Sequence, residues 1–258
     1  YKTFKIYFST RGDKKFEQEF INNLKENKLI IHLIKTEGDS DYSASIVTKN
    51  LVELDQFIMK LKNTFGDYIK NYYVSIIIYS KVFKLNKLLL NEKQQLLKFD
   101  KYSSEEEQIQ VDNEDILILK ELSQDANKSI IEIAKNTKLG LDLIKYRLKK
   151  LNNNLINSYR LMLNFNKLGF FHYVIKLQTK NIKESDENRL FTWCAIKNNI
   201  MYCTKRIGNF DYEINVTIKN IEELNNFLRE FKSEFDNIID HYELAVNSEL
   251  LKLNYIPF

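Results

Sequence analysis

The sequence predicts an α+β protein in which a winged helix-turn-helix is flanked by two ferredoxin-like βαββαβ domains. Two observations predict this architecture. The stretch that begins GDSDYSASIV at Gly38 matches, without a gap, the stretch that begins GNFDYEINVT at Gly208, 170 positions further along. Between the repeats, residues 111–158 contain three helical segments, with a short turn before the third.

The repeat keeps chemically distinctive residues in register. The matched pairs are Gly38 and Gly208, Asp41 and Asp211, Tyr42 and Tyr212, Lys49 and Lys219, Asn50 and Asn220, Leu54 and Leu224, Phe57 and Phe227, Lys62 and Lys232, and Phe65 and Phe235. Chance similarity of low-complexity sequence would not keep glycine, aspartate, tyrosine and phenylalanine aligned. Each copy therefore predicts the same folded unit.

Each copy has the periodicities of a βαββαβ unit. Expected strands and helices include residues 4–8, 16–27, 29–35, 42–48 and 51–65 in the first copy, and residues 173–177, 200–206, 212–218 and 221–235 in the second. A last strand is expected to close each unit. In the first helix, Phe16, Phe20 and Leu24 recur at every fourth position. One sheet face packs on the two helices. The other face is open and needs a partner, either the second copy in the same chain or a second chain.

The expected boundaries follow from these patterns. The two βαββαβ domains take residues 1–85 and 166–258, and the winged helix-turn-helix takes residues 111–165. The linker at residues 86–110 begins with a helix-like stretch. Its second part, DKYSSEEEQIQ, is polar and acidic, and we expect it to be mobile.

The three central helices carry start signals and apolar faces. The first begins at Asp112 with an acidic first turn, and the second begins with Ser129 and Glu132, which form a capping box. The expected inward residues are Ile116, Leu119 and Leu122, then Ile130, Ile133 and Ala134, then Leu141, Ile144, Leu148 and Leu151. Residues 155–165 are expected to be the wing strands.

Charge is polarised along this unit. Residues 112–134 contain six acids and two lysines, whereas residues 135–160 contain seven basic residues and one acid. The outer face of the third helix carries Asp142, Tyr146, Lys149 and Lys150, with Lys145 and Arg147 on its flanks. The net charge of +4 is too mild to indicate nucleic acid by itself. The concentration of positive charge on the third helix, which follows a tight turn, predicts contact with DNA phosphates.

Other residue types exclude several classes of site. Cys194 and Cys203 form no CxxC pair and are expected to be reduced packing thiols. The three histidines are dispersed, so no metal site is expected, and no cofactor is indicated. Trp193 is expected in the core. No apolar run has the length of a membrane span and no signal peptide is visible, so we expect a cytoplasmic protein.

Three stretches resemble the Lrp/AsnC, or feast/famine, family of transcription regulators. The matching marks are Asp112-x-x-Asp115-x-x-Ile118-Leu119, the run Tyr146-Arg147-Leu148-Lys149-Lys150-Leu151, Leu155-Ile156, Lys167-Leu168-Gly169, and the two turns GDSD and GNFD. The resemblance covers nearly the whole chain. It implies a DNA-binding winged helix-turn-helix and effector-binding, dimerising domains of the RAM type. It looks like a tandem, mainly archaeal arrangement that lacks a first helix-turn-helix before Tyr1.

The chain departs from the family pattern around the turn. Lys138 stands where the family usually has glycine, Gly140 where it has a serine or threonine cap, and Leu141 where it often has proline. Asn154 replaces a glycine before the wing, and can still adopt a left-handed turn. Asp142 places a negative charge where the helix tip would approach DNA.

The candidate site residues fall into two groups. The DNA-binding candidates are Lys128, Ser129, Lys138, Asp142, Lys145, Tyr146, Arg147, Lys149 and Lys150. Their alternative is surface charge, with Arg147 paired to an acid inside the domain. The resemblance implies an amino-acid effector near Gly38, Asp41, Gly208, Asn209 and Asp211. Their alternative is a tight turn in which the aspartates bind nearby amides.

The expected function is a DNA-binding transcription regulator, acting as a homodimer or as an intramolecular pseudo-dimer. The alternative is a ligand-sensing or interaction module whose helix-turn-helix does not bind DNA. An enzyme is the third possibility, because sirohaem decarboxylases resemble this fold. Those enzymes carry a His-Asn-Tyr-x-Arg-like run on the sheet, whereas residues 203–213 here read CTKRIGNFDYE and lack it, so we do not expect an enzyme. Haem-like absorbance in the purified protein would favour that reading.

Overall fold

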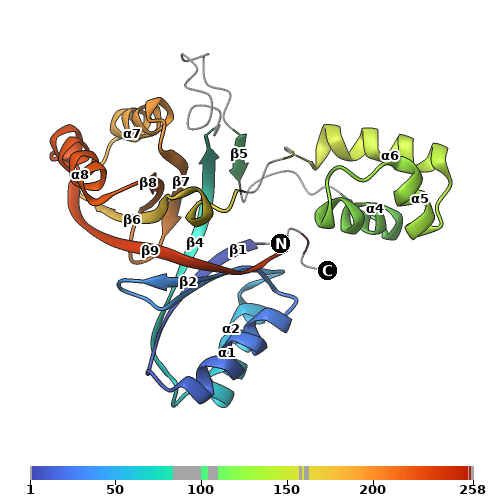
Figure 1. Cartoon of the computed structure of the whole chain (residues 1–258), viewed down its shortest axis with the longest axis horizontal. Coiled ribbons are helices and arrows are strands. Elements are labelled where there is room, and N and C mark those ends of the chain that lie inside the picture. Colours follow the sequence, from blue (N-terminus) through green and yellow to red (C-terminus); the bar gives the residue numbers. More distant parts are fainter. Residues whose placement is uncertain are drawn as a thin grey trace. The chain divides into compact units, whose positions relative to one another are not determined.

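The structure, a computed structural model, describes residues 2–83, 100–103, 110–156, 159, 163–254 and 256. It forms two compact units. The first contains residues 1–104 and 164–253, and the second contains residues 105–163 and 254–258 (Figure 1). Both copies of the repeat lie in the first unit.

The first unit contains both copies of the repeat. Its first copy consists of β1 (Lys2–Thr10), α1 (Lys14–Glu26), β2 (Ile30–Glu37), β3 (Tyr42–Thr48), α2 (Leu51–Phe65) and β4 (Ile69–Val82). Its second copy consists of β6 (Phe171–Thr179), α7 (Glu184–Ile196), β7 (Ile200–Ile207), β8 (Tyr212–Ile218), α8 (Ile221–Phe235) and β9 (Ile239–Leu253), preceded by the short helix η1 (Asn166–Leu168). Both copies have the predicted order βαββαβ.

Eight strands of this unit close into a ring of antiparallel pairs. Their order is β1-β3-β2-β9-β6-β8-β7-β4, and β4 pairs again with β1. The long strands β4 and β9 make the closure, because each pairs with its own copy near its start and with the other copy near its end. In this structure the open sheet faces of the two copies therefore cover each other within one chain.

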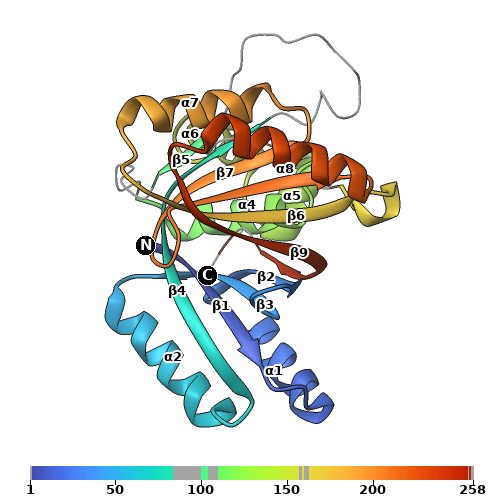
Figure 2. The same ribbon diagram turned by 90° about the vertical axis from the view of Figure 1, so that its left-hand side faces the viewer.

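The helices lie on the outside of the two half-sheets. Figure 2 shows α1 and α2 against one half and α7 and α8 against the other, with the strands between them. Each pair of helices buries its own apolar core, which includes Phe20 and Phe57 in the first half and Phe227 and Phe231 in the second. Trp193 packs against the phenylalanines of α8, as expected. Side chains that do not belong to these two cores lie in the space between the half-sheets.

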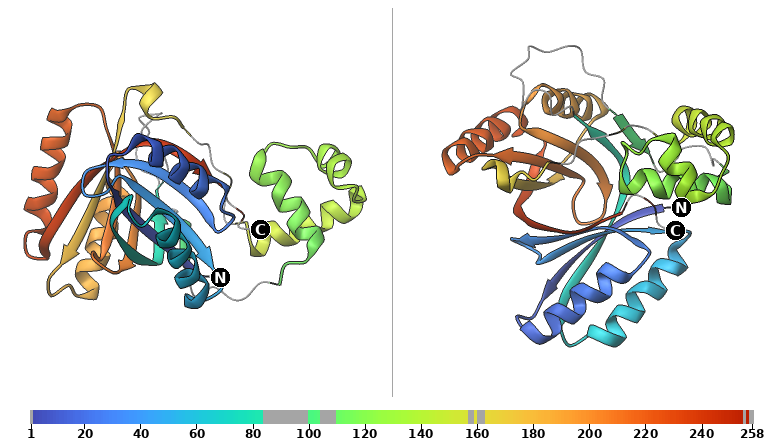
Figure 3. Two further views of the ribbon diagram at one scale, coloured as in Figure 1. Left: turned by 90° about the horizontal axis from the view of Figure 1, so that it is seen from below. Right: turned by 45° about the vertical axis from the view of Figure 1, so that its right-hand side comes forward.

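The second unit contains three helices, α4 (Asn113–Gln124), α5 (Ile130–Thr137) and α6 (Leu141–Asn154), which pack on one another (Figure 3). Ile118, Ile133, Ile144 and Leu151 form its buried centre. The predicted stripe of α4 was wrong in one position, because Ile118 and not Ile116 is at the centre. Leu141 was also placed wrongly, since 46% of its surface is exposed.

Two further expectations concern the connecting segments. Residues Asp100–Ser103, expected in a mobile linker, form the strand β5, which pairs with β4 at Tyr79–Val82. That end of β4 extends past β1, so it offers an unpaired edge to β5. The helix-like part of the linker lies outside the described residues, as do residues 157, 158 and 160–162 of the expected wing. Within the described residues, no helix has both the length and the apolar character needed to cross a bilayer.

Candidate functional site

The helix-turn-helix is built from local signals that the sequence displays. The side chains of Ser129 and Glu132 cap α5 reciprocally, as predicted. The turn begins at Lys138, whose φ of 60° is left-handed, a conformation that favours glycine. The family's usual glycine at this position is thus explained by the backbone. Gly140 precedes α6 without a side-chain cap.

Arg147 lies on α6 but binds the acids at the start of α4. Its guanidinium donates to Asp112 at 2.5 Å and to Asp115 at 2.9 Å, and it also pairs with Glu114. Hydrogen bonds to Asp112 and Asp115 raise the pKa of Arg147. Asp115 is buried, so the arginine neutralises a charge that water does not reach. Arg147 therefore holds α6 against α4. This agrees with the alternative interpretation of the sequence, in which Arg147 pairs with an acid inside the domain.

Two other basic candidates are also engaged within the unit. Lys128 pairs with Glu121 at 2.8 Å, which joins the loop before α5 to α4. The Lys150 ammonium lies 3.7 Å from a carboxylate oxygen of Asp115. Both interactions reduce the positive charge available to an outside partner. Ser129 is likewise occupied, since its hydroxyl takes part in the cap of α5.

The remaining candidates lie on the outer face of α6. Lys145, Tyr146 and Lys149 are exposed, and 69% of the Tyr146 surface is accessible. Asp142 is fully exposed one turn earlier, and a carboxylate oxygen lies 3.6 Å from the Lys145 ammonium. Lys138 is exposed at the turn before the helix. The exposed face thus combines two lysines, a tyrosine and one partly compensated acid.

The predicted effector turns have a clear structural purpose in the first unit. Gly38 and Gly208 have φ values of 140° and 150°, and each packs closely against the other copy. A side chain at Gly38 would meet the Leu244 carbonyl oxygen, and one at Gly208 would meet the Val74 carbonyl oxygen, both at 3.0 Å. The glycines are required because the turns touch the backbone of the opposite half-sheet.

The aspartates of the same turns bind the strand ends. Asp41 accepts hydrogen bonds from the backbone amide and the hydroxyl of Thr10, at 2.6 and 2.9 Å. Asp211 does the same with Thr179, at 2.7 Å for both. These hydrogen bonds agree with the alternative interpretation of the sequence, in which the aspartates stabilise tight turns by binding nearby amides.

Charged side chains fill much of the space between the two half-sheets. Glu213 accepts hydrogen bonds from Lys5 at 2.9 Å and from the Tyr7 hydroxyl, and it pairs with Arg206 at 3.1 Å. Burial acts to raise the pKa of Glu213, but the charges of Arg206 and Lys5 lower it well below its usual value. Burial lowers the pKa of Lys5 to about 8. Because Lys5 and Tyr7 belong to the first copy, this network ties the two copies together.

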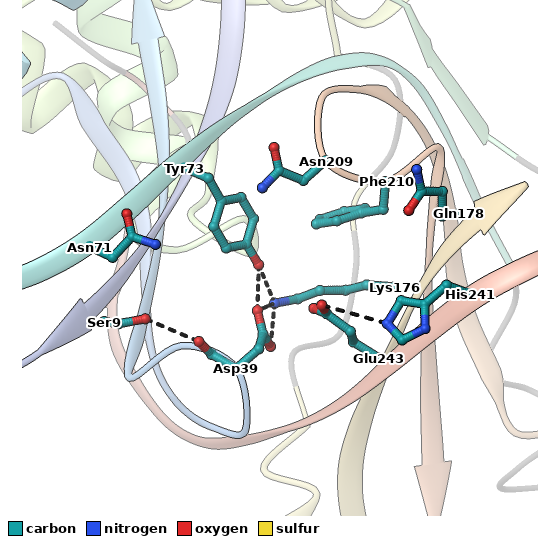
Figure 4. A pocket seen from close by; sticks show the side chains of 10 residues that line it. All are labelled: Ser9, Asp39, Asn71, Tyr73, Lys176, Gln178, Asn209, Phe210, His241 and Glu243. Atoms are coloured by element: carbon teal, nitrogen blue, oxygen red, sulfur yellow. Dashed lines mark hydrogen bonds and ion pairs between the residues drawn. The ribbon is translucent and has the colours of Figure 1, made fainter.

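A pocket of about 250 Å³ opens between the same half-sheets. It is lined by Ser9, Asp39, Asn71, Tyr73, Lys176, Gln178, Asn209, Phe210, His241 and Glu243 (Figure 4). Among the effector candidates, Asn209 is the one that lines it. The Lys176 ammonium contacts both carboxylate oxygens of Asp39, at 2.6 and 2.5 Å, and the Tyr73 hydroxyl at 2.6 Å.

Sequence reasoning missed most of this pocket. Lys176 lies on β6 and Glu243 lies on β9. In the sequence, these polar strand residues cannot be distinguished from residues that face solvent. One signal was available. The open sheet faces had to be covered, so polar residues on those faces, such as Lys176 and Glu213, had to meet partners from the other copy. The identity of those partners depends on strand closure, which local patterns do not specify.

The comparisons with known proteins agree with this architecture. No model of a known protein family matches the sequence. An uncharacterised HTH-type transcriptional regulator of Pyrococcus furiosus is 25% identical over 127 residues, which are 48% of this chain and 82% of that protein. About half of this chain therefore resembles an archaeal transcriptional regulator in sequence.

Solved structures of transcription regulators are also similar to this chain. Escherichia coli AsnC matches with a TM-score of 0.50 and 20% identity, over 58% of this chain and all of that chain. A transcriptional regulator of Neisseria meningitidis in complex with L-Met matches with a TM-score of 0.51 and 16% identity, over 57% of this chain and 95% of that one. These matches confirm that the chain shares its fold with Lrp/AsnC regulators.

A further solved structure matches almost the whole chain. The sirohaem decarboxylase NirDL, in complex with an iron-uroporphyrin III analogue, has a TM-score of 0.64 and 12% identity, over 99% of this chain and 74% of that chain. At this identity the likeness shows the fold alone. It extends over both copies of the repeat and the helical unit between them.

Proposed function

We propose that this chain is a transcription regulator of the Lrp/AsnC type whose helix α6 binds duplex DNA. The observation that carries the proposal is the exposed α6 face with Lys145, Tyr146 and Lys149. The basic residues that stabilise the unit, Arg147 and Lys128, point to acids inside it, whereas these three face outward. The likeness to an HTH-type regulator of Pyrococcus furiosus supports the same role.

In this proposal α6 is the recognition helix and its first turns approach the base edges. Lys145 and Lys149 lie four positions apart, so they share one side of the helix and bind phosphates of one backbone. Tyr146 is placed to contact a sugar or a base. Lys138 adds a phosphate contact at the turn. Asp142 limits affinity, because its carboxylate is repelled by phosphate.

We also propose that the first unit responds to a small effector. The regulator from Neisseria meningitidis was seen with L-Met, and its fold is shared by this chain. The polar pocket between the half-sheets supports an effector site, and Asn209 connects it to the predicted turn. The two copies supply one composite site within a single chain.

The DNA-binding proposal is tested by titrating the protein into a fluorescent, AT-rich duplex and following anisotropy. The variant Lys145→Glu/Lys149→Glu should weaken binding by about tenfold or more, because two phosphate contacts become repulsions. The matched control is Lys60→Glu/Lys70→Glu, which changes the net charge equally on exposed residues of the first unit. Equal losses in both variants, or no binding by the native protein at low salt, would refute the role of α6.

A further inference from the structure

The ammonium of Lys176 is buried at the wall of the pocket between the half-sheets and is held by side chains of the first copy. Lys176 lies on β6, in the second copy, and its side chain is only 2% exposed. Its Nζ contacts both carboxylate oxygens of Asp39, at 2.6 and 2.5 Å, and the Tyr73 hydroxyl at 2.6 Å (Figure 4). An ammonium has three donors, and these contacts use them. The lysine of one copy is therefore bound by the other copy as a charged ligand would be.

Three aromatic rings surround the same ammonium. The Lys176 Nζ lies 4.2 Å from the ring centre of Tyr7, and it lies 5.4 Å from that of Tyr73 and 5.6 Å from that of Phe210. Tyr7 and Tyr73 stack with centroids 4.6 Å apart, and Phe210 meets both rings edge to face, at 5.5 and 6.0 Å. Aromatic faces attract cations, and cages of such rings bind the ammonium groups of ligands. The three rings and the carboxylate of Asp39 together form an ammonium box.

The lysine and the carboxylate of the ammonium box both depart from the internal repeat. Tyr7 pairs with Ser43 and Lys176 pairs with Glu213, and Ser43 and Glu213 are separated by the 170 positions of the repeat. Lys176 therefore stands where the first copy has Tyr7. The carboxylate of the box stands, in the same way, where the second copy has Asn209. Each copy thus supplies a different half of the ion pair, so the filled box exists only where the first copy faces the second.

The ammonium box opens into the pocket and is not sealed in a core. Asp39, Tyr73, Phe210 and Lys176 all line the pocket, whose volume is about 250 Å³. The Asp39 side chain remains 19% exposed, so solvent reaches its carboxylate. A small molecule in the pocket would therefore meet the box directly if the lysine side chain were absent.

We propose that Lys176 acts as a tethered ligand. Its ammonium occupies the amine subsite of the pocket, so the native chain excludes a free primary amine from the ammonium box, and removal of the lysine side chain creates a site for one. This inference rests on the proposed effector role of the first unit and names the regulation of that site, because the cation subsite is filled from within the chain. A small effector of the native protein is accordingly bound in the open part of the pocket and is not selected by an ammonium group in the box.

Chemical rescue of the full-length chain tests the proposal. Lys176→Ala removes the side chain beyond Cβ, and n-propylammonium is the matching fragment. We expect the variant to melt below the native protein, because Asp39 is left without its cation. n-Propylammonium should raise the melting temperature of the variant saturably and bind in calorimetry with one site per chain, at roughly millimolar affinity for so small a ligand. 1-Propanol, which has the same size and no charge, should bind at least about tenfold more weakly.

Two variants control for unspecific effects of the amine. Lys176→Met keeps the ammonium box filled with an uncharged side chain and should not respond to n-propylammonium, and neither should the native protein. Lys60→Ala removes an exposed lysine from α2 and should melt as the native protein does. If Lys176→Ala does not fold without additive, the same comparison is made on its refolding yield, which n-propylammonium should raise and 1-propanol should not.

Two results would overturn the proposal. If Lys176→Met or the native protein responded to the amine as strongly as Lys176→Ala, the amine would bind outside the ammonium box. If n-propylammonium and 1-propanol had equal effects on Lys176→Ala, or neither had any, Lys176 would be an ion pair of the fold without a ligand-like role. No DNA and no effector of the native protein enter these measurements, so failure of the proposed effector response is distinguishable from failure of this inference.

Discussion

Arg147 is a basic residue on the predicted DNA-binding helix, and its surroundings assign it a different role. Residue spacing placed it beside Lys145 and Lys149, but its guanidinium turns back to the acids that begin α4. Charge patterns along one helix do not reveal which cations are already neutralised. Asp115, a buried acid, is the reason for this arrangement, because a buried carboxylate requires a partner.

Replacing Arg147 should therefore destabilise the helical unit. Arg147→Met leaves Asp115 buried without its main partner, and we expect a loss of about 2 kcal/mol in the free energy of unfolding of that unit. Amide hydrogen exchange in α4 to α6 measures it. Lys149→Met, on the exposed face, is the control and should change stability by less than about 0.5 kcal/mol. Unchanged exchange in Arg147→Met would contradict the structural role.

The repeat glycines give a second prediction for single residues. Gly38→Ala and Gly208→Ala should each cost about 1 kcal/mol or more, because the left-handed backbone and the nearby carbonyl oxygens both oppose a side chain. Gly12→Ala is the control, since nothing lies within 4 Å of the added carbon. Urea denaturation of the three variants measures the difference. Equal midpoints for Gly12→Ala and Gly208→Ala would show that the turns tolerate a side chain.

At the scale of elements, the sequence predicts most of the helices and strands because their signals are local. The capping box at Ser129, the periodicity of Phe20 and Leu24, and the repeated Gly-x-x-Asp turns each act over a few residues. The strand β5 was missed because its pairing depends on a free edge of β4, distant in sequence. The residues of the pocket were missed for a similar reason, since Lys176 and Asp39 meet through closure of the strand ring.

Two strands carry histidines that should make stability depend on pH. Burial lowers the pKa of His32, on β2, and of His172, on β6, to about 4. His172 also contacts Asn215 at 3.0 Å and Asn247 at 3.3 Å. In the unfolded chain both histidines titrate near 6.5, so the unfolded state binds more protons between about pH 6.5 and 4. Stability is therefore complete above pH 6.5 and is lost as the pH falls.

The expected slope is up to about 1.4 kcal/mol per pH unit for each histidine in that range. His172→Asn should make the dependence shallower, because it removes one of these two groups. Chemical denaturation at pH values from 7 to 4.5 measures the slopes. If His172→Asn and the native protein had the same slope, His172 would not be a cause of the pH dependence.

At the scale of the whole molecule, strand pairing joins the two repeats into one folding unit. The ring is closed by β2 with β9 and by β4 with β7, and the charges of Lys5 and Glu213 bridge the two halves inside it. Separate domains would melt independently. Shared strands and a shared polar interior should instead make the two halves melt together.

Trp193, the one tryptophan, reports on the second half and makes this expectation measurable. Phe20→Ala removes a fully buried ring from the first half, at a cost of about 3–5 kcal/mol. We expect it to lower the temperature at which Trp193 fluorescence changes. Phe16→Ala, at a position that is 37% exposed, is the control and should have a small effect. An unchanged Trp193 transition in Phe20→Ala would show that the halves are independent.

The central claim is that α6 contacts DNA phosphates, and the salt dependence of DNA binding tests it most directly. The affinity of the native protein for a duplex is measured by anisotropy between about 50 and 200 mM salt. We predict a steep linear fall of the logarithm of the affinity with the logarithm of the salt concentration. In Lys149→Ala the slope should be smaller by about one, because one phosphate contact is lost. A native protein that does not bind at 50 mM salt, or a slope that Lys149→Ala leaves unchanged, would contradict the account.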